Sequence, residues 1–451
     1  MKRLYLYNSL SNNLDEFRPI DESNVRMYAC GPTVYSGPHV GNARPLVVFD
    51  VLFRLLSLLY PKVTYVRNIT DVDDKINKRA AQRKITIREL TDEVIENFHN
   101  DLSLLNILPP TIEPRATFHI QEMIDVIQKL LDNGYAYQTA AHVLLSVKKL
   151  PNYGILSKRM LDQMIPGSRV EIGIYKRDPL DFVLWKPSRD NEPSWDSPFG
   201  PGRPGWHIEC SAMSHKYLGV QFDIHAGGHD LIFPHHENEI AQNYGAFGCL
   251  MANYWIHNEL VLVDNLKMSK SVGNVISISD VLQKMDGEII RYVLLSSHYQ
   301  KKLNWTDQAI HQAQQSLNKM YSALNLVTEF VETDYDESII DALCSNLNTP
   351  LALSHLINLA DEILKETDQS KINCGGSVLK KSASILGLLF RENWFKRNLE
   401  LPEEKIEELI AQRNQARKAK DYKKADEIRN YLTDHHISIE DTPSGTTWKV
   451  I

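Results

Sequence analysis

Histidine, cysteine and glutamate side chains that can bind a metal gather in one short stretch of the chain. Six of the sixteen histidines fall within residues 207–236, where the average of 16 in 451 gives about one. His235 and Glu239 stand four residues apart in a segment expected to begin a helix at Pro234, so both side chains share one face. Cys210 is a thiolate candidate from a neighbouring segment. These residue types at this spacing suit two ligands of one metal ion.

A zinc protease or a metal-free cluster of histidines could also contain such a stretch. His236-Glu237 begins the H-E-x-x-H motif of zinc proteases, but Ile240 occupies the place of the second histidine, which excludes that class. A set of hydrogen-bonded histidines around a cleft, without a metal, stays open as an alternative.

A first nucleotide-binding motif lies where a loop is expected to turn into a long helix. It reads His39-Val40-Gly41-Asn42. The free N–H groups and the positive dipole end of a helix attract phosphate, and Gly41 lets a nucleotide approach the backbone closely. His39 and Asn42 can donate hydrogen bonds to phosphate oxygens. Taken alone, a histidine at such a place is more often a helix cap.

A second motif, Lys267-Met268-Ser269-Lys270-Ser271, follows a predicted strand. Lys267 and Lys270 suit a loop that clamps a polyphosphate and neutralises developing charge, although a solvated basic loop is the simpler interpretation of this motif alone. Gly228 and Asp230 lie between the two motifs and could contact a ribose or an amine. The two motifs in this order favour a site for the polyphosphate of a nucleotide. The chain has no Walker motif, so it is not a P-loop enzyme.

The elements that must position these residues follow an α/β pattern. Residues 25–30 and 63–69 alternate like strands, and 41–60 carries apolar residues at helical spacing up to Pro61. Strand, helix and strand within about forty residues predict a parallel sheet covered by helices. Strand-like pieces return at 222–224 and 259–263.

The expected organisation is a Rossmann-type domain followed by two smaller ones. The Rossmann-type domain covers residues 1–300, with an insertion at about 115–205. Long segments with almost no Gly or Pro predict a helical bundle over 301–400. Residues 401–451 predict a charged helix pair and a short strand, a small mixed domain.

Composition excludes several classes. The chain has 43% hydrophobic and 24% charged residues, which are ordinary globular values. The five cysteines, an odd number with no C-x-x-C pair, argue against a disulfide framework and favour a reducing compartment, the cytoplasm. Asp50 and Arg54 interrupt the most apolar stretch, so no membrane span is expected.

A basic segment contrasts with the net charge of -7 of the whole chain. Within 412–429, seven basic residues against three acidic ones give a local charge of +4. Such a helix face suits phosphate contacts, and Tyr422 and Trp448 could stack on unpaired bases, although a solvated charged helix is the commoner origin of such a run. The candidate RNA contacts are Arg413, Arg417, Lys418, Lys420 and Trp448.

Five motifs together resemble the cysteinyl-tRNA synthetase family over essentially the whole chain. The nucleotide motifs are shared by class I synthetases, and the others are nearly specific to the cysteine enzyme. The motifs are Cys30-Gly31-Pro32-Thr33-Val34-Tyr35, His39-Val40-Gly41-Asn42-Ala43-Arg44, Gly205-Trp206-His207-Ile208-Glu209-Cys210-Ser211, Phe233-Pro234-His235-His236-Glu237-Asn238-Glu239 and Lys267-Met268-Ser269-Lys270-Ser271.

The resemblance implies roles for individual residues. It implies that one Zn²⁺ is bound by Cys30, Cys210, His235 and Glu239. It implies that Thr70 and Trp206 contact the substrate cysteine, and that ATP with Mg²⁺ is bound by His39, Gly41, Asn42, Gly228, Asp230 and Lys270. His39, Asn42, Lys267 and Lys270 are the implied catalytic residues. It also implies a nucleotide-clamp and stem-contact region at about 260–300, an anticodon-binding domain at 401–451, and a monomer.

The implied activity is the two-step ligation of L-cysteine to tRNA(Cys), through cysteinyl-adenylate. Zinc prefers a thiolate to a hydroxyl, so such an enzyme rejects serine without an editing domain. Asn42, Ala226, Asn265-Leu266 and His435-His436 depart from the family pattern. A cysteine ligase acting on an amino sugar of the mycothiol pathway, which lacks the C-terminal tail, and a non-catalytic RNA-binding or metal-storage protein are the alternatives.

Overall fold

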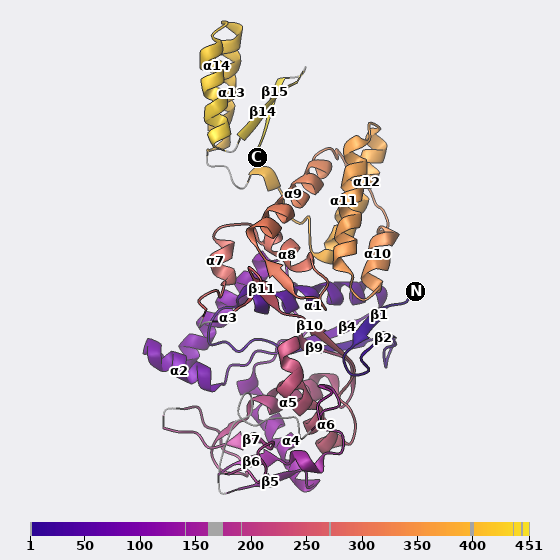
Figure 1. The fold of residues 1–451 in the computed structure, drawn as a ribbon, viewed down its shortest axis with the longest axis vertical. Helices are drawn as coiled ribbons and strands as arrows, with labels where there is room; N and C mark the ends of the chain where they lie inside the picture. Colours follow the sequence, from indigo (N-terminus) through magenta and orange to yellow (C-terminus); the bar gives the residue numbers. More distant parts are fainter. Residues whose placement is uncertain are drawn as a thin grey trace. The chain divides into compact units, whose positions relative to one another are not determined.

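The computed structural model describes residues 2–139, 141–160, 175–190, 192–269, 272–396, 401–435, 437–442 and 445–450. The chain forms two compact units, residues 1–388 and residues 389–451. Figure 1 shows their elements. None of the described helices is long and apolar enough to cross a membrane.

A four-stranded parallel sheet is the centre of the first unit. Its order is β10 (Ala252–Asn258), β9 (Phe222–Gly228), β3 (Val25–Ala29) and β4 (Val63–Arg67). The strands predicted at 25–30 and 63–69 are therefore confirmed. The strand predicted at 222–224 runs on to Gly228, because pairing with β10 extends it through Gly227 and Gly228, which have little intrinsic strand preference.

Helices cover both faces of this sheet. Helix α1 (Val40–Leu59), predicted at 41–60, connects β3 to β4 and lies on one face. Helices α5 (Trp206–Leu218) and α6 (Glu237–Phe247) lie on the other, as Figure 1 shows. Two short turns, η4 (His229–Leu231) and η5 (Ile232–His236), join β9 to α6.

The connections create a switch point between β3 and β9. The chain leaves β3 through α1 toward β4, whereas it leaves β9 through α6 toward β10 on the opposite side. In open α/β sheets, ligands bind at the carboxyl ends of two such strands. Cys30 follows one of these ends and Gly228 closes the other.

The region predicted as an insertion builds its own sheet between β4 and β9. This sheet has the antiparallel order β5-β6-β7-β8 and packs with α4 in one apolar core. The elements from β4 to α5 are α2 (Asp74–Arg83), α3 (Ile87–Leu104), η1 (Ala116–Phe118), α4 (Ile120–Asp132), β5 (Ala136–Gln138), β6 (Val143–Leu145), η2 (Val147–Lys149), β7 (Phe182–Lys186) and β8 (Arg203–Pro204).

Long helices follow the second half of the sheet, as the sequence predicts. The strand expected at 259–263 is β11 (Val261–Val263), which pairs with β12 and β13 outside the central sheet. The remaining elements of the unit are β1 (Tyr5–Asn8), β2 (Asn13–Glu16), β12 (Leu266–Lys267), α7 (Ile278–Leu282), α8 (Gly287–Leu295), β13 (Leu303–Trp305), α9 (Asp307–Leu324), α10 (Glu337–Cys344), α11 (Thr349–Lys365), α12 (Gln369–Ala383) and η6 (Ser384–Leu386).

The second unit is a helix pair with a hairpin. Its elements are η7 (Trp394–Lys396), α13 (Glu403–Lys418), α14 (Tyr422–Asp434), β14 (Ile437–Thr442) and β15 (Gly445–Val450). Apolar residues of both helices and β14 form its core: Ile406, Ile410, Ile428, Leu432, Ile437 and Ile439. The predicted charged helix pair is confirmed, and the predicted strand is a hairpin.

Candidate metal and nucleotide site

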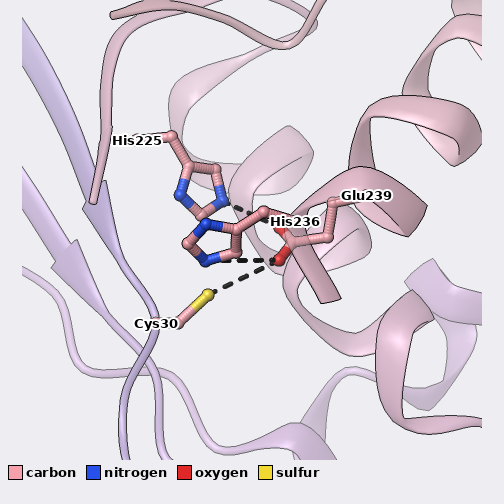
Figure 2. A group of neighbouring side chains, drawn as sticks. All are labelled: Cys30, His225, His236 and Glu239. Carbon is pink, nitrogen blue, oxygen red and sulfur yellow. Dashed lines mark hydrogen bonds and ion pairs between the residues drawn. The ribbon is translucent and has the colours of Figure 1, made fainter. Parts of the chain in front are cut away.

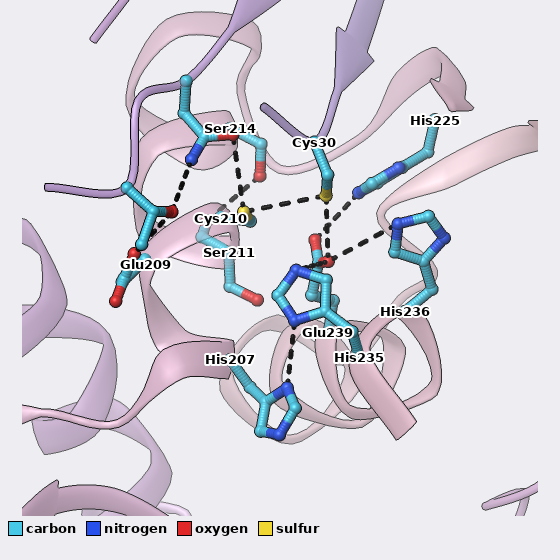
Figure 3. Close-up of polar contacts among 12 residues, drawn as sticks. Cys30, His207, Glu209, Cys210, Ser211, Ser214, His225, His235, His236 and Glu239 are labelled. Atoms are coloured by element: carbon cyan, nitrogen blue, oxygen red, sulfur yellow. Dashed lines mark hydrogen bonds and ion pairs between the residues drawn. The ribbon is translucent and has the colours of Figure 1, made fainter. Parts of the chain in front are cut away.

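Four residues from distant parts of the sequence meet at the switch point. Cys30 follows β3, Cys210 belongs to α5, His235 to η5 and Glu239 to α6 (Figure 3). One ligand atom from each lies within 4.8 Å of the others. We call these residues the first group.

The distances within the first group fit a tetrahedral zinc ion. The Sγ atoms of Cys30 and Cys210 are 3.7 Å apart, and Cys30 Sγ is 3.5 Å from Glu239 Oε1. Around a zinc ion with ordinary bond lengths, two sulfurs lie about 3.8 Å apart, and a sulfur and an oxygen about 3.5 Å. The donor set therefore fits zinc in both chemistry and spacing.

The local backbone at His235 differs from the predicted helix start. Phe233 is extended, with φ −135° and ψ 130°, because a residue before proline is excluded from the helical region. Residues Ile232–His236 form a π-type turn, and regular α6 begins at Glu237 rather than at Pro234. The predicted i,i+4 pair nevertheless forms, with His235 Nε2 3.0 Å from Glu239 Oε1.

Burial controls the protonation of these ligands. It raises the pKa of Cys30 well above its usual value and lowers the pKa of His235 to about 3. Burial also acts to raise the pKa of Glu239, but its interactions with the neighbouring His225 and His235 outweigh it and hold that pKa below its ordinary value. A neutral imidazole and a carboxylate are thus ready to bind a cation, and a bound cation would displace the thiol proton.

Two further histidines approach the same carboxylate, and the sequence did not single them out. His225, in β9, places Nε2 2.8 Å from Glu239 Oε2, and His236 places Nε2 4.0 Å from Oε1 (Figure 2). Cys30, His225, His236 and Glu239 form a second group with ligand atoms within 4.8 Å of one another. Only the density of histidines within 207–236 signalled them.

Two aromatic side chains, His207 and Trp206, contact His235 on the side of the first group that faces solvent. His207 Nδ1 is 3.0 Å from Nδ1 of His235, and the Trp206 ring stacks on His235 with centroids 4.3 Å apart at 18°. Trp206 is 39% exposed, whereas His235 is 1% exposed. The indole therefore lies between solvent and the first group.

Thr70, predicted to contact the substrate, belongs to a buried hydrogen-bond chain. Its hydroxyl donates to Glu209 Oε2 at 3.0 Å and accepts from Asn68 Nδ2 at 3.1 Å. Asn68 Oδ1 accepts from the Gly31 N–H at 2.8 Å. Burial raises the pKa of Glu209 well above its ordinary value. This series of hydrogen bonds links the end of β4 to α5 next to Cys210. The sequence did not predict this link.

The start of α1 has the capping geometry that the sequence left open. Asn42 N–H donates to His39 Nδ1 at 3.3 Å, and His39 N–H donates to Asn42 Oδ1 at 3.4 Å. His39 is thus the N-cap of α1, so this motif shapes the helix end whatever it binds.

We call residues 266–277 the lysine loop; the structure describes 266–269 and 272–277 of it, and Met268 and Ile276 lie against this helix end. Val40 N–H donates to the Ile276 carbonyl at 3.0 Å. A Cβ added to Gly41 would lie 2.7 Å from Met268 Cε, so the side chain of Met268 needs the glycine. The two predicted nucleotide motifs therefore adjoin. Lys267 is exposed in β12, and Lys270 lies outside the described residues.

The residues predicted between these motifs lie at the carboxyl end of β9. Gly228 ends the strand and Asp230 belongs to η4. A Cβ added to Gly228 would lie 2.6 Å from Asp230 Oδ1, so this glycine lets the carboxylate lie close to the backbone. His229 Nδ1 is 3.2 Å from Glu259 Oε1.

The structure accommodates the residues that depart from the family pattern. Asn265 takes φ +64°, beside Asp264 at +48°, in the two-residue turn between β11 and β12. Asparagine and aspartate tolerate these values, so the turn does not require glycine. Ala226 is buried and its carbonyl accepts from Cys30 N–H at 3.1 Å. His435 caps α14, and His436 lies outside the described residues.

The basic residues of the second unit divide into inward and outward ones. Arg413 is 6% exposed, and its two Nη atoms each donate to Asp441 at 2.9 Å, so its charge is engaged inside the unit. Arg417 also pairs with Asp441. Lys418 and Lys420 are exposed at the turn between α13 and α14. Trp448 Nε1 donates to Glu407 Oε1 at 2.7 Å.

Three family models match the chain. The model of the class I (C) tRNA synthetase catalytic domain matches residues 16–315. A DALR domain matches residues 338–391, and a cysteinyl-tRNA ligase anticodon binding domain matches residues 400–448. The expected Rossmann-type class I domain followed by helices is thereby confirmed.

Relatives cover almost the whole chain. The cysteine–tRNA ligase of Rhodospirillum rubrum is 48% identical over 99% of both chains, and that of Xanthobacter autotrophicus is 50% identical over 99% of both. The methionyl-tRNA synthetase of Mycobacterium tuberculosis with methionyl-adenylate shares the fold, at a TM-score of 0.56 and 14% identity over 81% of this chain and 89% of that one. The length and level of this similarity show that the chain belongs to the cysteine–tRNA ligase family of class I synthetases.

Proposed function

We propose that this chain ligates L-cysteine to the 3′ end of tRNA(Cys) at the switch point between β3 and β9. The observation that carries the proposal is the convergence of Cys30, Cys210, His235 and Glu239 beside the joined nucleotide motifs. A site for a thiol and a site for ATP then lie at the same edge of one sheet.

The first group would hold one Zn²⁺. When bound, this ion supplies a Lewis acid that prefers a thiolate to a hydroxyl, which selects cysteine over serine. In this proposal the protein shapes the cysteine pocket by two contacts. Trp206 stacks on His235 at the side that faces solvent, and Thr70 donates a hydrogen bond to Glu209 at the bottom of the pocket.

ATP with Mg²⁺ is the second substrate. In our proposal His39, Gly41 and Asn42 contact its phosphates at the start of α1, and Gly228 and Asp230 contact its ribose or the amino group of cysteine. Lys267 and Lys270 of the lysine loop neutralise developing charge; for Lys270 the role rests on the family motif alone.

Neither of the two reaction steps needs a covalent bond between a substrate and the protein. The cysteine carboxylate attacks the α-phosphate in line, an oxygen–phosphorus bond forms, and pyrophosphate leaves. The terminal ribose hydroxyl of the tRNA then attacks the carbonyl of the adenylate, and AMP leaves. No side chain is assigned as an obligatory base.

The exposed residues of the second unit are the proposed tRNA contacts. Lys418, Lys420 and Arg417 present charge at its surface, and Trp448 offers an indole. We infer that Arg413 supports this surface from inside. A monomer in the cytoplasm remains part of the proposal.

Cysteine-dependent ATP–pyrophosphate exchange followed by charging of tRNA tests the function. Both activities are expected with zinc-loaded protein. Exchange without charging would favour the amino-sugar ligase, which the match of residues 400–448 to an anticodon binding domain disfavours. Absence of exchange in the folded, zinc-loaded protein would refute both enzymes.

A further inference from the structure

The carboxylate of Glu239 is shared by two sets of possible ligands. Its Oε1 faces Cys30 and His235 of the first group, and its Oε2 faces His225 of the second (Figures 2 and 3). Each group has four residues, and Cys30 and Glu239 are common to both. The two groups therefore share Cys30 and Glu239, and His236 of the second group approaches the same oxygen, Oε1, as the first group, at 4.0 Å.

His236 carries a buried nitrogen, Nε2, that makes no hydrogen bond within the described part of the chain and lies 4.0 Å from Glu239 Oε1. The residue is 0% exposed. Its other nitrogen, Nδ1, lies 2.8 Å from His257 Nε2, and His257 Nδ1 lies 2.7 Å from Ser9 Oγ. An imidazole tied at one nitrogen and open at the other is the usual arrangement of a metal ligand.

The surrounding structure fixes both imidazoles of the second group. A Cβ added to Gly227 would lie 2.6 Å from His236 Cε1 and 3.0 Å from Nε2, so the glycine leaves the room that this ring occupies. His225 stacks on Trp255 with centroids 4.4 Å apart at 11°. Both rings are held facing Glu239.

We propose that Cys30, His225, His236 and Glu239 form a second binding site for a divalent, zinc-like cation. We call this site the second seat and the site formed by the first group the first seat; the ion occupies one or the other. This inference rests on the proposed zinc binding by the first group. Because Cys30 and Glu239 serve both seats, one ion is bound at a time. The second seat holds the ion when Cys210 or His235 is not engaged, away from the side that Trp206 closes.

The net charge of the ion with its ligands favours the second seat as the more buried site. In the first group two thiolates and a carboxylate leave a divalent ion with a net charge near -1, whereas in the second one thiolate and one carboxylate neutralise it. His225, His236 and Glu239 are each 0% exposed, and a neutral complex costs less to bury there.

Geometry makes the second seat the weaker one. His236 Nε2 and Glu239 Oε1 are 4.0 Å apart, whereas a nitrogen and an oxygen bound to one tetrahedral zinc lie about 3.3 Å apart. The ring must move toward the carboxylate on binding. The first seat, whose spacing already fits, is thus preferred when all its ligands are present.

Cobalt binding to the metal-stripped full-length chain distinguishes the seats, because thiolate-to-cobalt absorption reports the number of bound sulfurs. Wild type should bind one Co²⁺ with two sulfurs. The variant with Cys210→Ala and His235→Ala should still bind one Co²⁺, with about half the sulfur-to-metal absorption and about 10- to 100-fold weaker affinity. Adding His236→Asn should abolish this binding, whereas adding His215→Asn, a histidine outside both groups, should not.

Several results would overturn the second seat. One is a folded double variant, judged by circular dichroism, that binds no Co²⁺; another is binding that survives His236→Asn. Two Co²⁺ per wild-type chain would refute alternation. If the double variant does not fold, Cys210→Ala alone replaces it, and His236→Asn must again weaken its one-sulfur complex. Wild-type protein that binds no Co²⁺ would instead contradict the proposed function itself.

Discussion

Cys30 Sγ and Cys210 Sγ lie 3.7 Å apart although 180 residues separate them along the chain. One thiol follows the central strand β3 and the other projects from α5 on the face of the same sheet. The whole inserted region folds between them, so the pair depends on β9 returning beside β3. This spacing underlies the first prediction.

Replacing Cys30 should remove most of the bound zinc. Cys30→Ser takes a sulfur ligand from both groups, and we expect zinc affinity to fall about 100-fold or more. Elemental analysis of dialysed protein measures this loss, and cysteine-dependent exchange should fall with it. Cys249→Ser, which changes a cysteine outside both groups, is the control and should leave the zinc content unchanged. Undiminished zinc in Cys30→Ser would contradict the assignment.

Gly41→Ala should disturb the joint between the two nucleotide motifs. The new Cβ would lie 2.7 Å from Met268 Cε and 3.0 Å from the His39 ring, so both side chains must move. We expect kcat/KM for ATP to fall about 10- to 100-fold, since small misplacements of reacting groups cost this much. Gly37→Ala is the matched control, because its Cβ would meet nothing within 4 Å. Partial rescue by adding Met268→Ala would identify the steric cause, and its absence would reject it.

Thr70→Val should weaken cysteine binding. Valine keeps the shape of the threonine side chain but removes the hydroxyl that Glu209 and Asn68 share. Leaving these buried polar groups without their hydrogen bond costs about 1–3 kcal/mol of free energy. Pyrophosphate exchange at varied substrate should show a raised KM for cysteine and an unchanged KM for ATP. Thr70→Ser restores the hydroxyl and should recover most of the affinity. An equal rise in both KM values would point to general disruption.

Removing exposed charge from the second unit should affect tRNA alone. Lys418→Ala with Lys420→Ala should raise the KM for tRNA(Cys) and lower the slope of log affinity against log salt by about 1–2. ATP–pyrophosphate exchange, which needs no tRNA, serves as the internal control. If tRNA affinity and its salt dependence stay at wild-type values, these lysines do not contact tRNA.

Asp101 should impose a pH-dependent cost on stability. Burial raises its pKa to about 6, so between pH about 4 and 6 the folded state binds more protons than the unfolded state. Stability due to this group therefore falls as pH rises through that window. Asp101→Asn should stabilise the protein by about 1–2 kcal/mol above pH 6 and by nothing below about pH 4.

Urea unfolding at pH 7.5 and pH 4 measures this difference. Glu96→Gln, an exposed change on the same helix, should alter stability by less than about 0.5 kcal/mol at either pH. A gain for Asp101→Asn that is equal at both pH values would rule out the proposed titration.

Local signals carried much of the fold. The alternation at 25–30 and the helical spacing at 41–60 predicted β3 and α1 because each reflects the periodicity of a single element. Spacing also predicted the pair His235 and Glu239, since four residues make one turn of helix.

The sequence by itself determined the family, the two predicted nucleotide motifs and the meeting of His235 with Glu239, because these depend on residues that are close along the chain. The family resemblance, rather than local periodicity, predicted that Cys30 and Cys210 lie together, and only the tertiary structure decided that Met268 packs on Gly41 and that Arg413 turns inward to Asp441. It also placed His225 and His236 near the carboxylate of Glu239. These relationships arise where separate strands and helices pack together, and local periodicity carries no information about which faces will meet.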